Sequence, residues 1–72
     1  MSSYETLVAL SGRFKPNSTI RHLKTGGLYR VVCLARIEAN LQAAYTYESL
    51  QTHDFWIRSQ IEMEDGRFEL MV

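Results

Sequence analysis

The chain has 72 residues, enough for one small domain that buries only roughly 60% of the surface its unfolded form exposes. Eight Lys and Arg residues balance eight Asp and Glu residues, so no overall charge draws the chain to nucleic acid or to an anionic membrane. No apolar run approaches the roughly 20 residues that cross a bilayer, which predicts a soluble protein with no membrane partner.

The cysteine and histidine content bears on the cellular compartment and on metal binding. Cys33 is the single cysteine, and the N-terminus lacks the basic stretch and long apolar core of a signal peptide, which predicts a reducing, cytoplasmic setting. The strong metal ligands besides carboxylates are Cys33, His22 and His53, and their spacing matches no metal-binding pattern. No cofactor motif is present either, so we expect neither a metal nor a cofactor.

The first 18 residues are predicted to form an N-terminal arm. Residues 1–10 fit a short amphipathic helix about as well as a strand, and this alternative stays open. Residues 11–18 contain a glycine, turn-forming residues and the only proline, which predicts an irregular connection. We therefore divide the chain into an arm, residues 1–18, and a domain, residues 19–72.

A β-hairpin is predicted at the start of the domain. A short basic segment, residues 20–24, is followed by the turn signal Gly26-Gly27 and then by a longer apolar segment, residues 28–37. Alternation along that second segment predicts an apolar face made of Tyr29, Val31, Cys33, Ala35 and Ile37. The same alternation places Arg30 and Arg36 together on the opposite face.

Three more strands are predicted after the hairpin. They cover residues 43–50, 55–59 and 67–72, with a four-residue loop before the second and a helical turn at residues 61–64 before the third. Small sheets protect their edges by closing or nearly closing, so we expect an all-β domain, a strongly bent antiparallel sheet of five strands forming a small barrel. A flat sheet covered by the arm is the alternative.

Several motifs in this order resemble a family of small bacterial and bacteriophage proteins known only as a domain of unknown function. The motifs are Arg21-His22-x-Lys24-x-Gly26-Gly27-x-Tyr29-Arg30-Val31, Ala35-Arg36-x-Glu38-Ala39-x-Leu41, Tyr47-x-Ser49-Leu50, Trp56-Ile57-Arg58 and Glu62-x-x-Asp65-Gly66-Arg67-Phe68. The chain has Ser59 where the family usually has proline and Met63 where an aromatic is usual. The resemblance implies an SH3-like barrel and a phage or prophage setting, and it implies no reaction.

The candidate site is a cationic and aromatic surface. Trp56 and Arg58 share a face of their strand, and with the arginines of the second strand they would suit a phosphate, a carboxylate or a stacked base. The alternative is that Trp56 only shields the end of the barrel while Arg58 pairs with a nearby carboxylate. The predicted binding residues are Arg21, His22, Lys24, Arg30, Trp56 and Arg58.

These observations favour a binding module over an enzyme. No Ser or Cys nucleophile lies near His22 in the sequence, and a hydrolase built on His22 or Asp54 is the least favoured hypothesis. We expect a non-enzymatic interaction module, a monomer or a homodimer, with a protein partner that in a phage setting would be a host protein. The alternative is a module that binds nucleic acid or a nucleotide.

Overall fold

Five strands form where the alternation and the turn signals predict them, and a helical connection lies between the last two. The structure is a computed structural model that describes residues 9–72. Its strands are β1 (Thr19–His22), β2 (Leu28–Arg36), β3 (Ala43–Ser49), β4 (Phe55–Ser59) and β5 (Phe68–Met71). The helical segments α1 (Gln60–Glu62) and η2 (Met63–Arg67) connect β4 to β5. Ser59 begins α1, because its hydroxyl accepts a hydrogen bond from the Glu62 amide at 3.3 Å.

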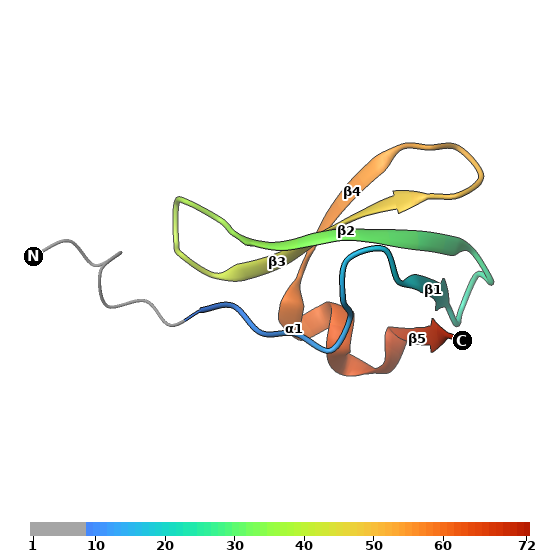
Figure 1. The fold of residues 1–72 in the computed structure, drawn as a ribbon, viewed down its shortest axis with the longest axis horizontal. Helices are drawn as coiled ribbons and strands as arrows, with labels where there is room; N and C mark the ends of the chain where they lie inside the picture. The colour runs from blue at the N-terminus through green and yellow to red at the C-terminus, as the bar shows by residue number, and fades with distance from the viewer. Residues whose placement is uncertain (1–8) are drawn as a thin grey trace, which may run out of the picture.

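All five strands belong to one antiparallel sheet with the order β4-β3-β2-β1-β5 (Figure 1). The expected all-β class, with five strands in a strongly bent antiparallel sheet, is confirmed. The sheet does not close into a barrel, since β4 and β5 are its two edges and are not hydrogen-bonded to each other. The α1–η2 segment carries the chain from one edge to the other.

A bulge in β2 reverses the faces of the second half of that strand. Val31 lies opposite Tyr47, but Cys33 lies opposite Thr46, so the register shifts between Val31 and Cys33. An extra residue in one strand of a pair moves every later side chain to the other face. Arg30 and Arg36 therefore point to opposite faces, and the prediction that they share one is wrong.

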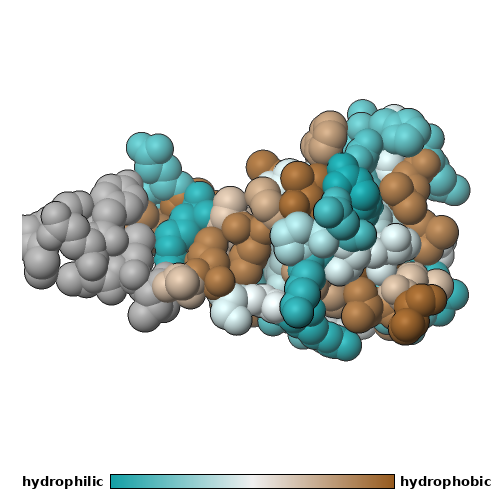
Figure 2. Space-filling model, in the orientation of Figure 1, coloured by the Kyte–Doolittle hydropathy of each residue, from teal (hydrophilic) through white to brown (hydrophobic). Residues whose placement is uncertain are grey.

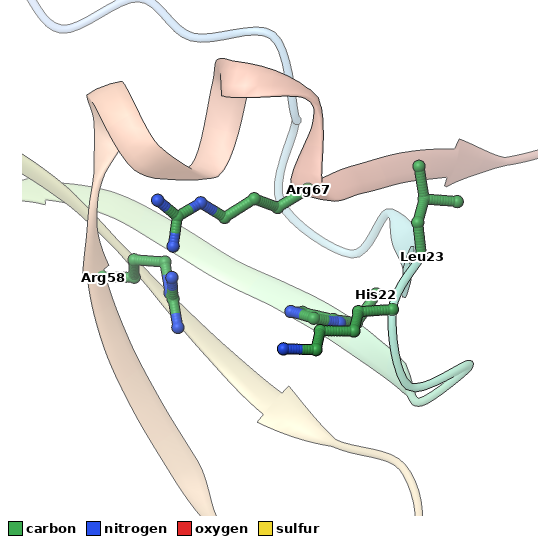
Figure 3. Close-up of a pocket in the computed structure, with 5 residues that line it drawn as sticks. His22, Leu23, Arg58 and Arg67 are labelled. Atoms are coloured by element: carbon green, nitrogen blue, oxygen red, sulfur yellow. The ribbon is translucent and has the colours of Figure 1, made fainter.

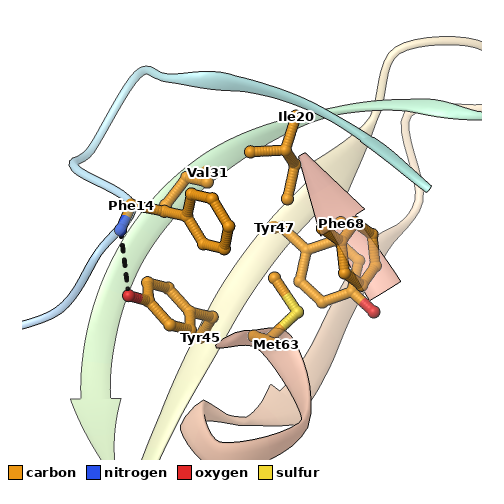
Figure 4. Close-up of a cluster of buried hydrophobic side chains, with 7 residues drawn as sticks. All are labelled: Phe14, Ile20, Val31, Tyr45, Tyr47, Met63 and Phe68. Atoms are coloured by element: carbon orange, nitrogen blue, oxygen red, sulfur yellow. Dashed lines mark hydrogen bonds between the residues drawn. The ribbon is translucent and has the colours of Figure 1, made fainter. Parts of the chain in front are cut away.

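The core lies on the concave side of the sheet, which we call the inner face (Figure 4). It consists of seven buried side chains, Phe14, Ile20, Val31, Tyr45, Tyr47, Met63 and Phe68. Rings of β2, β3 and β5 meet edge to face within it, with 5.3 Å between the centroids of Tyr29 and Tyr47 and 5.7 Å between those of Tyr47 and Phe68.

Part of the predicted arm packs into this core. Residues 9–18 are irregular, as expected for 11–18, but the Phe14 side chain is only 2% exposed and its amide donates to the Tyr45 hydroxyl at 3.1 Å. The chain around Asn17 is also tied to β2, because the Asn17 amide donates to the Val31 carbonyl at 2.8 Å. The helix or strand proposed for residues 1–10 falls mostly outside the described residues.

Candidate functional site

The turn between β1 and β2 is a tight hairpin with one glycine in the left-handed region. Gly26 has φ of 77°, which favours glycine, and its amide donates to the His22 carbonyl at 2.7 Å. The His22 amide in turn donates to the Gly27 carbonyl at 2.9 Å. This turn places His22, Leu23 and Lys24 at one side of a hollow in the surface.

A hollow of about 530 Å³ lies between this turn and the opposite edge of the sheet. Its lining comes from three distant parts of the chain, and we call it the basic hollow: His22, Leu23, Lys24, Arg58 and Arg67. Figure 3 shows the guanidinium groups of Arg58 and Arg67 on one side of it and His22 on the other. The curvature of the sheet thus brings together cations that are far apart in the sequence.

Acidic side chains flank only one side of the basic hollow. Glu62 lies between the two arginines, with its Oε1 3.3 Å from Arg58 Nη1 and 3.7 Å from Arg67 Nη1. Asp65 pairs with Arg67 at 2.9 Å. Lys24 has no carboxylate partner within residues 9–72. Because two carboxylates face three permanent cations, the basic hollow keeps a positive charge.

His22 is held by its neighbours in one orientation. Its ring packs edge to face on Phe68 with 4.9 Å between centroids, and its Nδ1 accepts a hydrogen bond from the Thr25 amide at 3.3 Å. In the neutral ring the proton is therefore on Nε2, which can donate to a ligand. Within residues 9–72 no hydroxyl or thiol side chain hydrogen-bonds to His22.

Comparison with models of protein families, with curated proteins and with solved structures finds no match for this chain. The family resemblance of the sequence stays a prediction.

The predicted binding residues divide between the two faces of the sheet. His22, Lys24 and Arg58 meet in the basic hollow. Arg21 pairs with Glu69 of β5 on the opposite, outer face. Arg30 also lies on the outer face, where it bonds Glu48 at 2.8 Å and Asn17 Oδ1 at 3.1 Å.

The Arg30 and Glu48 pair is a structural contact. The Arg30 guanidinium, followed by His53 at 3.2 Å, lowers the pKa of the Glu48 carboxyl. Arg30 does not join Trp56 and Arg58, because β3 separates β2 from β4 and the two strands present these residues on different faces. Arg30 lies opposite Glu48 on the outer face, whereas Trp56 and Arg58 lie opposite the inward-facing Tyr47 and Tyr45.

Trp56 lies two residues before Arg58 on β4, on the same face, as the alternation predicts. It sits opposite Tyr47 and is 52% exposed, outside the lining of the basic hollow. Arg67 was missed as a site residue. The sequence signal for it is only a basic residue after the turn Asp65-Gly66, and nothing in that pattern shows that it reaches Arg58.

The free edge of β4 is a second surface feature, separate from the basic hollow. Within the part of the chain that the structure describes, β4 pairs with β3 alone, and its consecutive residues Phe55, Trp56 and Ile57 are 62%, 52% and 71% exposed. On the face shown in Figure 2, apolar side chains of the described residues are interspersed with charged ones. An exposed edge strand with three consecutive apolar residues is a candidate site for association.

Two absences complete the description. Among residues 9–72, no three His, Cys, Asp or Glu side chains gather to hold a metal ion. No helix in the same residues is long and apolar enough to span a membrane.

Proposed function

We propose that this chain is a non-enzymatic interaction module that binds an extended segment of a protein partner along the free edge of β4. The observation that carries the proposal is the edge itself: β4 has one neighbour in the sheet, and Phe55, Trp56 and Ile57 are all more than half exposed. Alternate backbone groups of such a strand have no partner in the sheet and can pair with an added strand.

The two edges of the sheet differ in a way that favours β4. The β5 edge carries the ion pair between Glu69 and Arg21, and charged side chains are a common protection of an edge. The three consecutive apolar residues of β4 carry no charge before Arg58. An added strand there would cover Phe55 and Ile57 on one face and Trp56 on the other, which gives both backbone pairing and side-chain contacts.

The cellular setting is part of the same proposal. The resemblance to a bacterial and bacteriophage family supports a phage or prophage origin, in which case the partner is a host protein that the module occludes. The single cysteine supports a cytoplasmic location. A second copy of this chain is the competing occupant of the β4 edge, since a small core gains stability from association.

The test compares two lysine substitutions. The full chain with a tag is used to recover proteins from a bacterial lysate, with nuclease and at high salt, as wild type, Ile57→Lys and Ile61→Lys. Ile57 lies on the edge strand, whereas Ile61 lies in α1 and is 81% exposed, so it is a matched control for added charge. We expect one protein to be recovered by wild type and Ile61→Lys and lost with Ile57→Lys.

Two results would overturn the proposal. One is equal recovery of the partner by both lysine variants, which places the contact elsewhere. The other is a mass from light scattering that doubles with concentration for wild type but not for Ile57→Lys, with no other protein recovered, which makes the occupant a second copy. Circular dichroism of each variant checks that the sheet is intact.

A further inference from the structure

The basic hollow presents donors from several directions. Lys24 comes from the β1–β2 turn, Arg58 from β4 and Arg67 from the end of η2, while His22 stands across from the two arginines (Figure 3). A carboxylate has two oxygens in one plane and suits a single guanidinium fork. A phosphate monoester has three terminal oxygens and close to two negative charges, so it can bond to donors on several sides at once. The arrangement favours phosphate.

Size and surroundings identify what carries the phosphate. A hollow of about 530 Å³ is much larger than a phosphate and falls within the range of roughly 300–1,000 Å³ of small-molecule sites. Trp56 is two residues from Arg58 on the same strand face, about 6.5 Å along the strand, and its ring is half exposed. An exposed indole beside a phosphate site offers a face on which a base can stack.

We propose that the basic hollow binds a small nucleoside phosphate, with the phosphate among Lys24, Arg58 and Arg67, and the base against Trp56. His22 donates from Nε2 to a phosphate oxygen, because its Nδ1 is occupied by the Thr25 amide. The phosphate site goes beyond the protein-binding edge and does not depend on it, since its charged groups lie on the inner face while Ile57 points to the outer face. Trp56 is the one residue that the two proposals share.

The Glu62 carboxylate competes with a bound phosphate for the two arginines. It lies between Arg58 and Arg67, at 3.3 and 3.7 Å, where a phosphate oxygen would sit. The side chains of these pairs are 31% to 50% exposed, and exposed ion pairs of this kind are weak. The carboxylate is therefore a competitor that a dianion can displace, and its removal should strengthen binding.

The test is a titration of the full chain with adenosine monophosphate, inorganic phosphate and adenosine. Trp56 is the only tryptophan, so its fluorescence reports directly on a base stacked against it, and calorimetry follows the binding of phosphate. We expect adenosine monophosphate to bind more tightly than either of its parts and to quench the fluorescence. Binding should weaken by about tenfold or more in Arg58→Gln and Arg67→Gln, since each removes a charged hydrogen bond.

Control variants distinguish binding at the basic hollow from a nonspecific effect of net charge. Arg21→Gln makes the same change in net charge on the outer face and should leave the affinity unchanged. Glu62→Gln should raise the affinity, whereas Glu69→Gln, the partner of Arg21, should not. Equal losses in Arg21→Gln and Arg58→Gln, or adenosine binding as tightly as adenosine monophosphate, would overturn the phosphate site. Inorganic phosphate binding as tightly as adenosine monophosphate would overturn the assignment of the base to Trp56.

The titration also distinguishes failure of this site from failure of the β4 edge. Ile57→Lys should lose binding to the protein partner and keep binding to the nucleotide. Arg67→Gln should keep the protein partner and bind the nucleotide more weakly.

Discussion

The Tyr45 hydroxyl donates a hydrogen bond to Glu64 Oε2 at 2.6 Å, and this contact ties the centre of the sheet to η2. The same carboxylate oxygen accepts from the Arg13 amide at 3.0 Å and from Gln60 Nε2 at 3.1 Å. The Tyr45 oxygen in turn accepts from the Phe14 amide (Figure 4). One phenol and one carboxylate therefore hold together β3, the helical segment and residues 9–18.

Removing the Tyr45 hydroxyl should destabilise the domain. Tyr45→Phe leaves the buried Phe14 amide without its acceptor and Glu64 without its shortest donor, so we expect a loss of about 1 to 3 kcal/mol in the free energy of unfolding, measured with urea. Tyr47→Phe is the matched control, because the Tyr47 hydroxyl has no hydrogen-bond partner within residues 9–72. Equal losses in the two variants would contradict a special role for the Tyr45 hydroxyl.

The same pair predicts how stability depends on pH. Burial by itself raises the pKa of Glu64, but hydrogen bonds from Tyr45, Arg13 and Gln60 outweigh it, and the pKa lies below its ordinary value. A lowered pKa stabilises the fold above the ordinary value of about 4.3, and that stability is lost as the pH falls through the folded pKa. Urea unfolding between about pH 6 and pH 2 should therefore show a smaller acid loss in Glu64→Gln than in wild type. Parallel curves would contradict it.

At high pH, stability depends on a different group, Tyr45, and is lost as the pH rises. Burial, followed by the hydrogen bond to Glu64, raises the pKa of Tyr45. A raised pKa stabilises the fold below the ordinary value of about 10, and this contribution is lost as the pH rises beyond it. Wild type should lose stability above about pH 10 more steeply than Tyr45→Phe, which has no phenol to ionise at this position. Thermal unfolding across this range measures the difference.

Gly12 should not tolerate even alanine. A Cβ at this position would lie 2.2 Å from the Tyr45 hydroxyl oxygen and 2.9 Å from Leu34, closer than atoms can approach. The added methyl must displace either residues 9–18 or the Tyr45 ring, which we expect to cost about 1 to 3 kcal/mol in urea unfolding. Ser11→Ala, one residue earlier and exposed, should be nearly silent. A Gly12→Ala variant as stable as wild type would show that the chain around Gly12 does not pack on Tyr45.

Phe14 tests whether the predicted arm is part of the folding unit. Phe14→Ala removes a side chain that is 2% exposed and packs against Tyr45 with 5.8 Å between ring centroids. Loss of a buried phenylalanine costs about 3 to 5 kcal/mol, a large share of the stability of so small a domain. Leu23→Ala, at a half-exposed position, should cost much less. A small effect of Phe14→Ala would instead support a separable arm.

Much of the fold could be predicted because its signals are local. Alternation located the strands, and Gly26-Gly27 and Asp65-Gly66 marked turns, both with a glycine at positive φ. The bulge in β2 could not be predicted, because Val32, Cys33 and Leu34 are all apolar and fit either register. The core position of Phe14 was also hidden, since an isolated aromatic in a Gly- and Pro-containing stretch has no periodic pattern around it.

The candidate site could be predicted only in part, because only some of its residues are related by a local sequence pattern. His22 and Lys24 are close in the sequence, and Trp56 and Arg58 share a face of one strand, so alternation could group each pair. Whether the pairs meet depends on the curvature of the sheet, which brings β4 and the β1–β2 turn to one hollow and adds Arg67. Arg21 and Arg30 point to the outer face and have their own carboxylate partners, which no local pattern reveals.

The most direct test of the β4 edge is amide hydrogen exchange of the full chain, free and in complex with the partner that it recovers. Strand addition predicts that residues 55–59 gain protection in the complex, because their free amides become paired, while residues 68–71 at the other edge keep their rates. Unchanged exchange in residues 55–59, with protection appearing at β5 instead, would contradict binding along β4.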